Sequence, residues 1–286
     1  MPQSINEIKA KITSMKSMSK ITKAMQMVSV SKRTKTDSKL RNFQSFIQTF
    51  DSIMESIYAI QGVEDHIFFS AKKAKRCTAY LTITSDRGLA AGYNNNVLRL
   101  LGQEIQNLGE DEYKLYMIGS KGYDFARRLK LPVENEYIFV PDDLIYMDIE
   151  PVLNQTLSDY LNGQVDEVVI IYNNYLTQLV QEATIKRILP LEKKVEHKYS
   201  PKVYIYEPTE TEIIESALLK YLDAVIYGVV LTAKLSEHAA RMNAMQNATD
   251  NANEIIKETQ LLYNKARQAA ITQEINEIVG GAMALQ

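Results

Sequence analysis

Apolar residues recur every three or four positions toward the two ends of the chain, but form short unbroken runs in its middle. Near the N-terminus the repeat is most regular at Leu40, Phe43, Ile47, Phe50, Met54 and Ile57. Alternating steps of three and four are typical of the seam of a coiled-coil helix. Between residues 3 and 61 there is neither proline nor glycine, so we predict one long N-terminal helix.

The first half of this helix carries a less regular apolar series. It comprises Ile5, Ile8, Ile12, Met15, Met18, Ile21, Met25 and Val28. Consecutive steps of three in this series predict a stammer, which locally overwinds the helix.

A second long helix is predicted at the C-terminus, because only Gly228 interrupts a proline-free stretch between residues 209 and 279. Its seam consists of Leu218, Leu222, Val225, Val229 and Thr232, followed by Ala252, Ile255, Thr259, Leu262, Ala266 and Ala269. The many small residues of this seam let a partner helix approach closely. Since the segment between the two helices is itself folded, we expect the helices to pair within the chain, antiparallel to each other.

The middle of the chain alternates strand-like and helix-like segments. Apolar runs predict strands at residues 78–84, 114–118, 137–140 and 168–172, with a longer strand at 179–189 beside them. Helices are expected between the strands at 94–108, 121–129 and 149–161. This order is typical of β-α-β units and of a mostly parallel sheet. We therefore predict the α/β fold class, with a long antiparallel coiled coil of N- and C-terminal helices (1–61 and 209–286) and an inserted α/β domain (75–200).

Charge, cysteine and histidine content exclude several classes of protein. The chain has 33 basic and 35 acidic residues, a balance that argues against a dedicated nucleic-acid binder. Its single cysteine, Cys77, cannot form an internal disulfide and is expected to act as a small hydrophobic residue at a strand edge. The three histidines, His66, His197 and His238, are too scattered for a zinc site. His238 is expected at a solvated position of the C-terminal helix.

Neither a membrane span nor a leader segment is evident. No apolar run approaches the length of a transmembrane helix, and the first residues lack the apolar centre of a signal peptide. We therefore expect the chain itself to be soluble, and its single cysteine favours a cytoplasmic protein.

The most enzyme-like feature is a glycine-containing loop, residues 85–93, which follows a strand and opens a helix. A doubly wound sheet binds phosphate at such a place. The loop lacks the third glycine of a dinucleotide fingerprint and the Gly-Lys-Ser/Thr ending of a phosphate loop, so a tight turn capped by Asp86 is the preferred interpretation. Residues 119–122 follow the next strand in the same way. A nucleotide-binding α/β enzyme with helical arms stays as an alternative.

The first 41 residues are strongly basic, with ten lysines and arginines against Glu7 and Asp37. A basic coiled coil that binds nucleic acid is a second alternative on electrostatic grounds, although no aromatic residue for stacking on bases precedes Phe43. The apolar seam is too narrow for a helix that lies on a membrane surface. An acidic protein partner that surrounds the helix accounts for both the charge and the narrow seam.

Several separated motifs, in order along the chain, give a resemblance to one family. They are residues 20–25 (KITKAM), 85–89 (SDRGL), 206–208 (YEP), 248–252 (ATDNA) and 271–284 (ITQEINEIVGGAMA). The last of these fits the family signature at each defined position. On these motifs the chain resembles the gamma subunit of the F-type ATP synthase over its full length. The resemblance implies a coiled coil of the terminal helices, a Rossmann-like α/β domain, and no catalytic site or cofactor in this chain.

The resemblance further implies a central rotor shaft. In this family the shaft stands inside a ring of three alpha and three beta subunits, and its foot holds the epsilon subunit and the membrane c-ring. Ion-driven rotation of the c-ring is coupled through the shaft to ATP synthesis or hydrolysis at the beta subunits. The implied location is the cytoplasmic face of a bacterial cell membrane, without a membrane span in this chain.

The family's contact residues can be carried over onto matching positions. Contacts with the beta subunits fall on Lys20, Lys23, Met25, Arg241, Arg267, Gln268 and Thr272. Contacts on the c-ring and epsilon side fall on Tyr204, Tyr206 and Glu207. Many relatives have Cys-Gly-Gly where this chain has Ala90, Ala91 and Gly92. The regulatory cysteine pair of the chloroplast form is also missing, so we expect no redox role for this loop.

Overall fold

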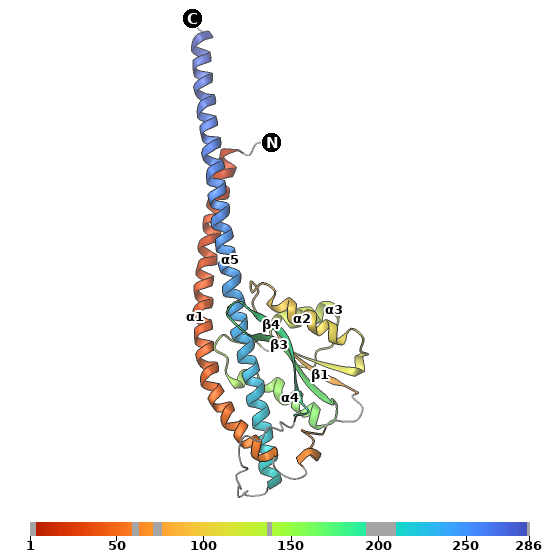
Figure 1. Ribbon diagram of the computed structural model, residues 1–286. Helices are drawn as coiled ribbons and strands as arrows, with labels where there is room; N and C mark the ends of the chain where they lie inside the picture. The colour runs from red at the N-terminus through yellow and green to blue at the C-terminus, as the bar shows by residue number, and fades with distance from the viewer. Residues whose placement is uncertain (1–3, 59–62, 71–75, 136–138, 193–209, 285–286) are drawn as a thin grey trace. The chain divides into compact units, whose positions relative to one another are not determined.

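The computed structural model describes residues 4–58, 63–70, 76–135, 139–192 and 210–284 (Figure 1). The chain forms two compact units: unit 1, made of residues 1–29 with 242–286, and unit 2, made of residues 30–241. Two long helices, α1 (Ile5–Tyr58) and α5 (Glu210–Ala284), contribute to both units. The prediction of a long helix at each end of the chain is thus confirmed.

In unit 1, the first part of α1 pairs with the last part of α5 (Figure 1). Ser19 donates a hydrogen bond to Asn253 at 2.8 Å, and the hydroxyl groups of Thr22 and Thr249 lie 2.7 Å apart. Partner numbers fall along α5 as they rise along α1, so the two helices are antiparallel, as predicted.

The seam of α1 in unit 1 differs from the predicted apolar series. Three members of that series are 48%, 57% and 53% exposed, namely Met18, Ile21 and Val28. A regular seam is formed instead by the buried and half-buried residues Ile5, Ile8, Ile12, Met15, Ser19, Thr22, Gln26 and Ser29, while Met25 is half-buried outside this series. These step regularly by four and three, so the predicted stammer is wrong. The prediction considered only apolar residues and therefore missed the small hydroxyl side chains of the seam. A hydroxyl group can be buried there because it can donate a hydrogen bond to a carbonyl of its own helix, as Ser29 does to Met25 at 2.8 Å.

The seam of α5 in unit 1 ends before the helix does. Its buried positions are Met242, Met245, Thr249, Ala252 and Thr259. Leu262 and Ala269, which the sequence placed in the seam, are exposed. In Figure 1 the end of α5 continues past the start of α1, and the described side chains of residues 271–281 are all exposed. These last turns of α5 therefore have no helix packed against them within the described part of unit 1.

Among its described residues, unit 2 is built around a four-stranded sheet in the order β2-β1-β3-β4. The strands are β1 (Thr78–Ile83), β2 (Tyr113–Ile118), β3 (Glu167–Tyr175) and β4 (Gln181–Leu189). Strand β1 pairs in parallel with β2 and β3, and β4 pairs antiparallel with β3. The mostly parallel sheet, with a longer strand beside it, is as predicted.

Helices follow or precede these strands as expected. They are α2 (Tyr93–Ile105), α3 (Ser120–Leu129) and α4 (Glu150–Leu161), with 3-10 turns at Val63–Asp65, Glu110–Glu112 and Tyr146–Asp148. The predicted strand at 137–140 is wrong in its described half, because Phe139 and Val140 form no strand. Tyr137 and Ile138 lie outside the described residues. Val140 is buried in the core without pairing with the sheet, so its apolar side chain serves core packing.

Alternate residues of the central strands point into two different cores. Tyr80 and Val169 pack with Leu101 of α2 on one face. Leu81 and Ile170 belong to the larger core on the other face, which includes residues of α1, α4 and α5. The sheet is therefore covered on both faces, and in unit 2 the two long helices form part of one of its covering layers.

Gly228 of α5 lets α1 and α5 approach closely in unit 2. A Cβ atom at this position would lie 3.1 Å from Cδ1 of Ile47 and 3.5 Å from Cε1 of Phe43. The Phe43 ring meets the ring of Tyr227 edge-on, with 4.9 Å between centroids. The predicted seam through Phe43 and Ile47 is thus confirmed.

Candidate partner-contact surface

The exposed face of α1 in unit 1 is basic. Its exposed lysines are Lys9, Lys11, Lys16, Lys20 and Lys23. Glu7 is the one acidic residue among the described residues from 4 to 29. Because the lysines all lie outside the regular seam, pairing of the helices leaves their charge on the surface. This surface has the charge that an acidic partner would require.

Three predicted contact residues lie close together on this part of α1. Lys20 and Lys23 are exposed, and Met25 is half-buried. The ammonium group of Lys23 donates to Gln26 at 3.1 Å, and Gln26 in turn donates to Gln246 of α5. The lysine is thereby oriented by a side chain that is itself held in the seam.

An apolar stripe runs beside the lysines, and sequence reasoning missed it as a surface. Met18, Ile21, Met25 and Val28 follow one another at steps of three and four, and three of the four are exposed. Exposed apolar side chains rimmed by charge are typical of interaction sites. The signal that could have revealed the stripe is the hydroxyl residues Ser19, Thr22 and Ser29, whose spacing already completes the seam.

The end of α5 offers a second exposed surface in unit 1. The predicted contacts Arg267, Gln268 and Thr272 are all exposed. The Thr272 hydroxyl donates to the Gln268 carbonyl at 2.9 Å, within its own helix. Apolar side chains continue along the helix at Ile271, Ile275 and Ile278, which are 47%, 54% and 72% exposed. Steps of four and three put them on one helix face, so this end presents an apolar stripe to solvent.

Arg241, another predicted beta-subunit contact, is buried in unit 2. Its guanidinium donates to Glu237 Oε1 at 2.8 Å and to the carbonyl groups of Arg87 and Gly88 at 3.1 Å and 3.3 Å. These bonds tie α5 to the loop after β1, so Arg241 has a structural role inside the chain. Its contact with a beta subunit stays a prediction. The predicted c-ring and epsilon-side contacts Tyr204, Tyr206 and Glu207 lie outside the described residues.

Glu237 stands between two buried cations. It accepts from Arg241, and its other carboxylate oxygen accepts from the ammonium group of Lys234 at 3.1 Å. Burial alone raises the pKa of Glu237, but the charges of Lys234 and Arg241 outweigh burial and hold this pKa below its usual 4.5. The carboxylate is therefore ionised in the folded chain at neutral pH.

His238 is fully buried, which corrects the expectation of a solvated position. Every residue of α5 from 233 to 241 is buried, because this part of the helix is covered on all sides in unit 2. Neither ring nitrogen of His238 has a hydrogen-bond partner among the described residues. Burial lowers the pKa of His238 to about 4, against the opposing charge of Glu237, so the imidazole is neutral at pH 7.

The glycine-containing loop after β1 uses its polar groups internally. The carboxylate of Asp86 accepts the backbone N–H groups of Ser120 and Val140, each at 2.9 Å. Asp86 therefore caps the start of α3 and holds the following loop, a role that differs from the predicted cap of its own turn.

The next two N–H groups of α3 are also bonded within the chain. Lys121 donates to the carbonyl of Ser85 at 3.2 Å, and Gly122 donates to Oγ1 of Thr84 at 2.8 Å. A helix start binds phosphate through N–H groups that have no partner in the protein. The start of α3 is therefore closed to phosphate, which argues against the nucleotide-enzyme alternative at residues 119–122.

Metal-binding groups, membrane-spanning helices and a reactive thiol are the remaining features to consider in the part of the chain that the structure describes. It contains no group of three or more His, Cys, Asp or Glu residues that could hold a metal ion. None of its helices is long and apolar enough to cross a membrane. Cys77 is buried, and burial is the main cause that raises the pKa of its thiol. Its backbone N–H donates a hydrogen bond to the carboxylate of Asp166 at 3.2 Å. These surroundings agree with the predicted role as a small hydrophobic residue.

The fold and the surface together define a class of protein in which two long terminal helices pair, flank an α/β domain and carry exposed basic and apolar stripes for contact with partners. The chain belongs to the ATP synthase family, whose model matches residues 4–285. Within that family its similarity is to the gamma chains, which are non-catalytic subunits.

One relative is the ATP synthase gamma chain of Exiguobacterium sp. (strain ATCC BAA-1283 / AT1b), which is 41% identical over 285 residues and 99% of each chain. The central stalk/c-ring structure of Tetrahymena thermophila mitochondrial ATP synthase contains a chain with 25% identity and a TM-score of 0.65, matched over 80% of this chain and 99% of that one. The OSCP/F1/c-ring structure of Euglena gracilis mitochondrial ATP synthase contains a chain with 21% identity and a TM-score of 0.71, over 98% and 94%. The last similarity confirms the fold alone.

Proposed function

We propose that this chain is the central rotor shaft of an F-type ATP synthase. An ion-driven c-ring turns the shaft, and its rotation is coupled to ATP synthesis or hydrolysis at the beta subunits. The observation that carries the proposal is the gamma-chain relative, which is 41% identical over 99% of both chains. The proposed partners are three alpha subunits, three beta subunits, the epsilon subunit and the c-ring, at the cytoplasmic face of a bacterial cell membrane.

The polar seam of unit 1 supports a shaft. Apolar side chains alone allow one helix to shift along another, whereas paired polar side chains in a seam specify a single register. The Ser19–Asn253 and Thr22–Thr249 hydrogen bonds are such pairs. A shaft needs one register, because slippage between its helices would dissipate torque.

The exposed stripes of unit 1 are the proposed contacts with the beta subunits. Lys20, Lys23 and Met25 lie on α1, and Arg267, Gln268 and Thr272 lie on the end of α5. Exposed ion pairs contribute about 0–1 kcal/mol each, so contacts of this kind can be broken and remade at each angle. In the same proposal, residues 1–61 and 209–286 are the shaft helices and residues 75–200 are the foot domain.

The proposal is tested by purification of the tagged chain from detergent-solubilised membranes. We expect alpha, beta and epsilon subunits and the c-ring to purify with it, and we expect the isolated chain to hydrolyse no ATP. Robust ATP turnover by the isolated chain would reject the proposal.

A single contact is tested by Met25→Lys. The added charge beside Lys23 is expected to impair ATP-driven ion pumping by the assembled enzyme more than it lowers the stability of the isolated chain. Met27→Lys is the matched control, because Met27 is 61% exposed and two residues further along the helix, so it faces away from the Met25 stripe. Equal ion pumping by the Met25→Lys enzyme and by the control enzyme would show that Met25 is not part of the contact.

A further inference from the structure

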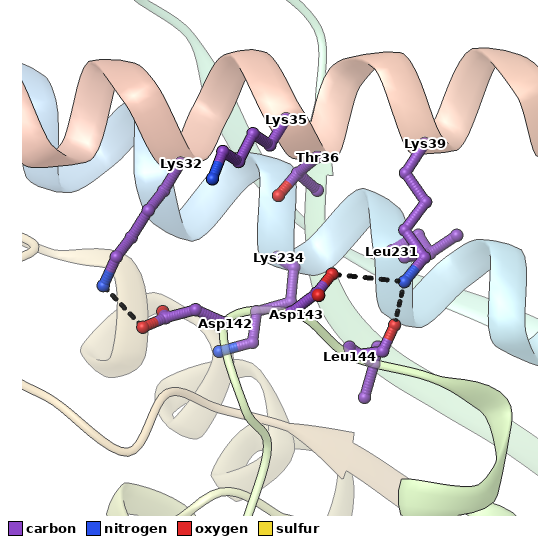
Figure 2. A pocket seen from close by; sticks show the side chains of 9 residues that line it. All are labelled: Lys32, Lys35, Thr36, Lys39, Asp142, Asp143, Leu144, Leu231 and Lys234. Atoms are coloured by element: carbon purple, nitrogen blue, oxygen red, sulfur yellow. Dashed lines mark hydrogen bonds and ion pairs between the residues drawn. The ribbon is translucent and has the colours of Figure 1, made fainter.

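Unit 2 contains a basic cavity that has no part in the proposed function. Its volume is about 190 Å³, and it lies between α1, the loop at residues 142–144 and α5 (Figure 2). The charged residues of its lining are Lys32, Lys35, Lys39, Lys234, Asp142 and Asp143. Four ammonium groups therefore share one cavity with two carboxylates.

The three lysines of α1 reach the same cavity because of their spacing. Lys32, Lys35 and Lys39 are separated by three and four residues, which puts them on one face of a helix. Figure 2 shows them on the side of α1 that faces the loop. Thr36, on the same face, adds a hydroxyl group to the lining.

The two carboxylates balance only part of this positive charge. Lys32 is paired with Asp142 at 2.5 Å. Lys39 donates to the Leu144 carbonyl and lies 3.7 Å from Asp143, whose side chain is fully exposed, so solvent screens that pair. Lys35 forms no hydrogen bond or ion pair with the other lining residues drawn in Figure 2.

The fourth lysine is buried and shares its counter-ion. Lys234 is only 5% exposed, and its carboxylate partner Glu237 also pairs with the buried Arg241. Two buried cations thus share one buried carboxylate, and the carboxylate of Asp142, which also interacts with Lys234, is already paired with Lys32. An excess of buried positive charge is costly unless an anion balances it.

From this arrangement we propose that the cavity binds a phosphate-type anion, held by Lys35, Lys39 and Lys234. Lysine ammonium groups bind phosphate as point charges. A water molecule occupies roughly 30 Å³ of liquid, so the cavity has room for a small anion in place of several waters. The anion is either free or the terminal group of a phosphate monoester. Because it contacts α1, the loop and α5 at once, it holds these three segments of unit 2 together.

The test is calorimetric titration of the full chain with inorganic phosphate, pyrophosphate and glycerol phosphate at constant ionic strength, with chloride as the reference anion. We expect saturable binding of phosphate and tighter binding of pyrophosphate, which carries more charge. Lys35→Gln is expected to weaken binding roughly threefold, the effect of losing one exposed charge contact. It should leave the fold intact, because Lys35 is exposed.

The control variant is Lys16→Gln, which removes an exposed lysine of α1 in unit 1 and should bind phosphate like the unchanged chain. Binding of glycerol phosphate as well as phosphate indicates a phosphate ester as the natural ligand, and binding of phosphate and pyrophosphate alone indicates a free anion. Equal affinity of both lysine variants, or no binding beyond that of chloride, would overturn the proposal.

Discussion

The hydroxyl groups of Thr22 and Thr249 meet in the buried seam of unit 1, 2.7 Å apart, and each also lies within hydrogen-bond distance of a carbonyl of its own helix. Each hydroxyl has a single proton, so one threonine donates to its helix while the other donates across the seam. The helices are joined here by a bond that apolar residues of the same shape could not form.

We expect Thr22→Val to lower the free energy of unfolding by about 1 kcal/mol, the net value of a buried hydrogen bond, because it leaves Thr249 without its partner across the seam. The double variant Thr22→Val/Thr249→Val should recover most of that loss, because two valines pack without an unpaired polar group. Urea unfolding of the full chain, analysed as a double-mutant cycle, measures the coupling. Additive effects of the two substitutions would show that the bond is not formed.

The same seam shows where sequence reasoning succeeded and where it failed. In unit 2 the apolar repeat through Phe43 and Ile47 was correctly predicted, because large apolar residues fill the seam there. In unit 1, small hydroxyl residues take the seam and Met18 and Ile21 face solvent. Hydrophobicity therefore marks this seam only where large apolar side chains fill it.

Tertiary contacts account for other differences. The sheet was predictable because its central strands are continuous apolar runs, as strands covered on both faces must be. Neither the burial of His238 nor the bonds from Asp86 to Ser120 and Val140 could be predicted, because each depends on a segment distant in sequence. Of the proposed contact surface, the lysines were predictable and the apolar stripe beside them was not.

Gly119 precedes α3 with a φ of +92°, and a Cβ atom there would overlap the Thr84 carbonyl oxygen. Gly119→Ala is therefore expected to destabilise the chain by at least about 2 kcal/mol, through backbone strain and the clash. Gly102 is the matched control, because it lies inside α2 with no atom near its Cβ position. Gly102→Ala should stabilise the chain by about 0.5–1 kcal/mol. Thermal unfolding distinguishes the two, and equal Tm values would contradict the described geometry of Gly119.

The burial of His238 predicts a specific dependence of the chain's stability on pH. Its pKa falls from 6.5 to about 4 on burial beside Glu237, Lys234, Arg241 and Asp142. Between these pH values the unfolded chain binds a proton at His238 and the folded chain does not, so stability is lost as the pH falls. From pH 7 to pH 5 this one group should cost about 2 kcal/mol.

His238→Met removes the titrating group and both unpartnered nitrogens while keeping a buried side chain. We expect its stability at pH 7 to match or exceed that of the unchanged chain, and its pH dependence between 7 and 5 to be flatter by about 2 kcal/mol. Urea unfolding at several pH values measures the difference. The same pH dependence in both chains would show that His238 is protonated, or accessible to water, in the folded state.

Substitutions in the exposed apolar stripe at the end of α5 should affect assembly with partner subunits but not the stability of the isolated chain. Ile275 and Ile278 are exposed and have no helix packed on them within the described part of unit 1, so Ile275→Asp with Ile278→Asp should change the stability of the isolated chain by less than about 0.5 kcal/mol. If this stripe contacts the alpha and beta subunits, two buried carboxylates would be costly, and we expect affinity for a preparation of alpha and beta subunits to fall at least tenfold, or about 1.4 kcal/mol. Asn276→Asp adds a charge at an exposed position between them and should bind normally. Normal binding by the double variant would show that the stripe faces solvent in the assembled enzyme.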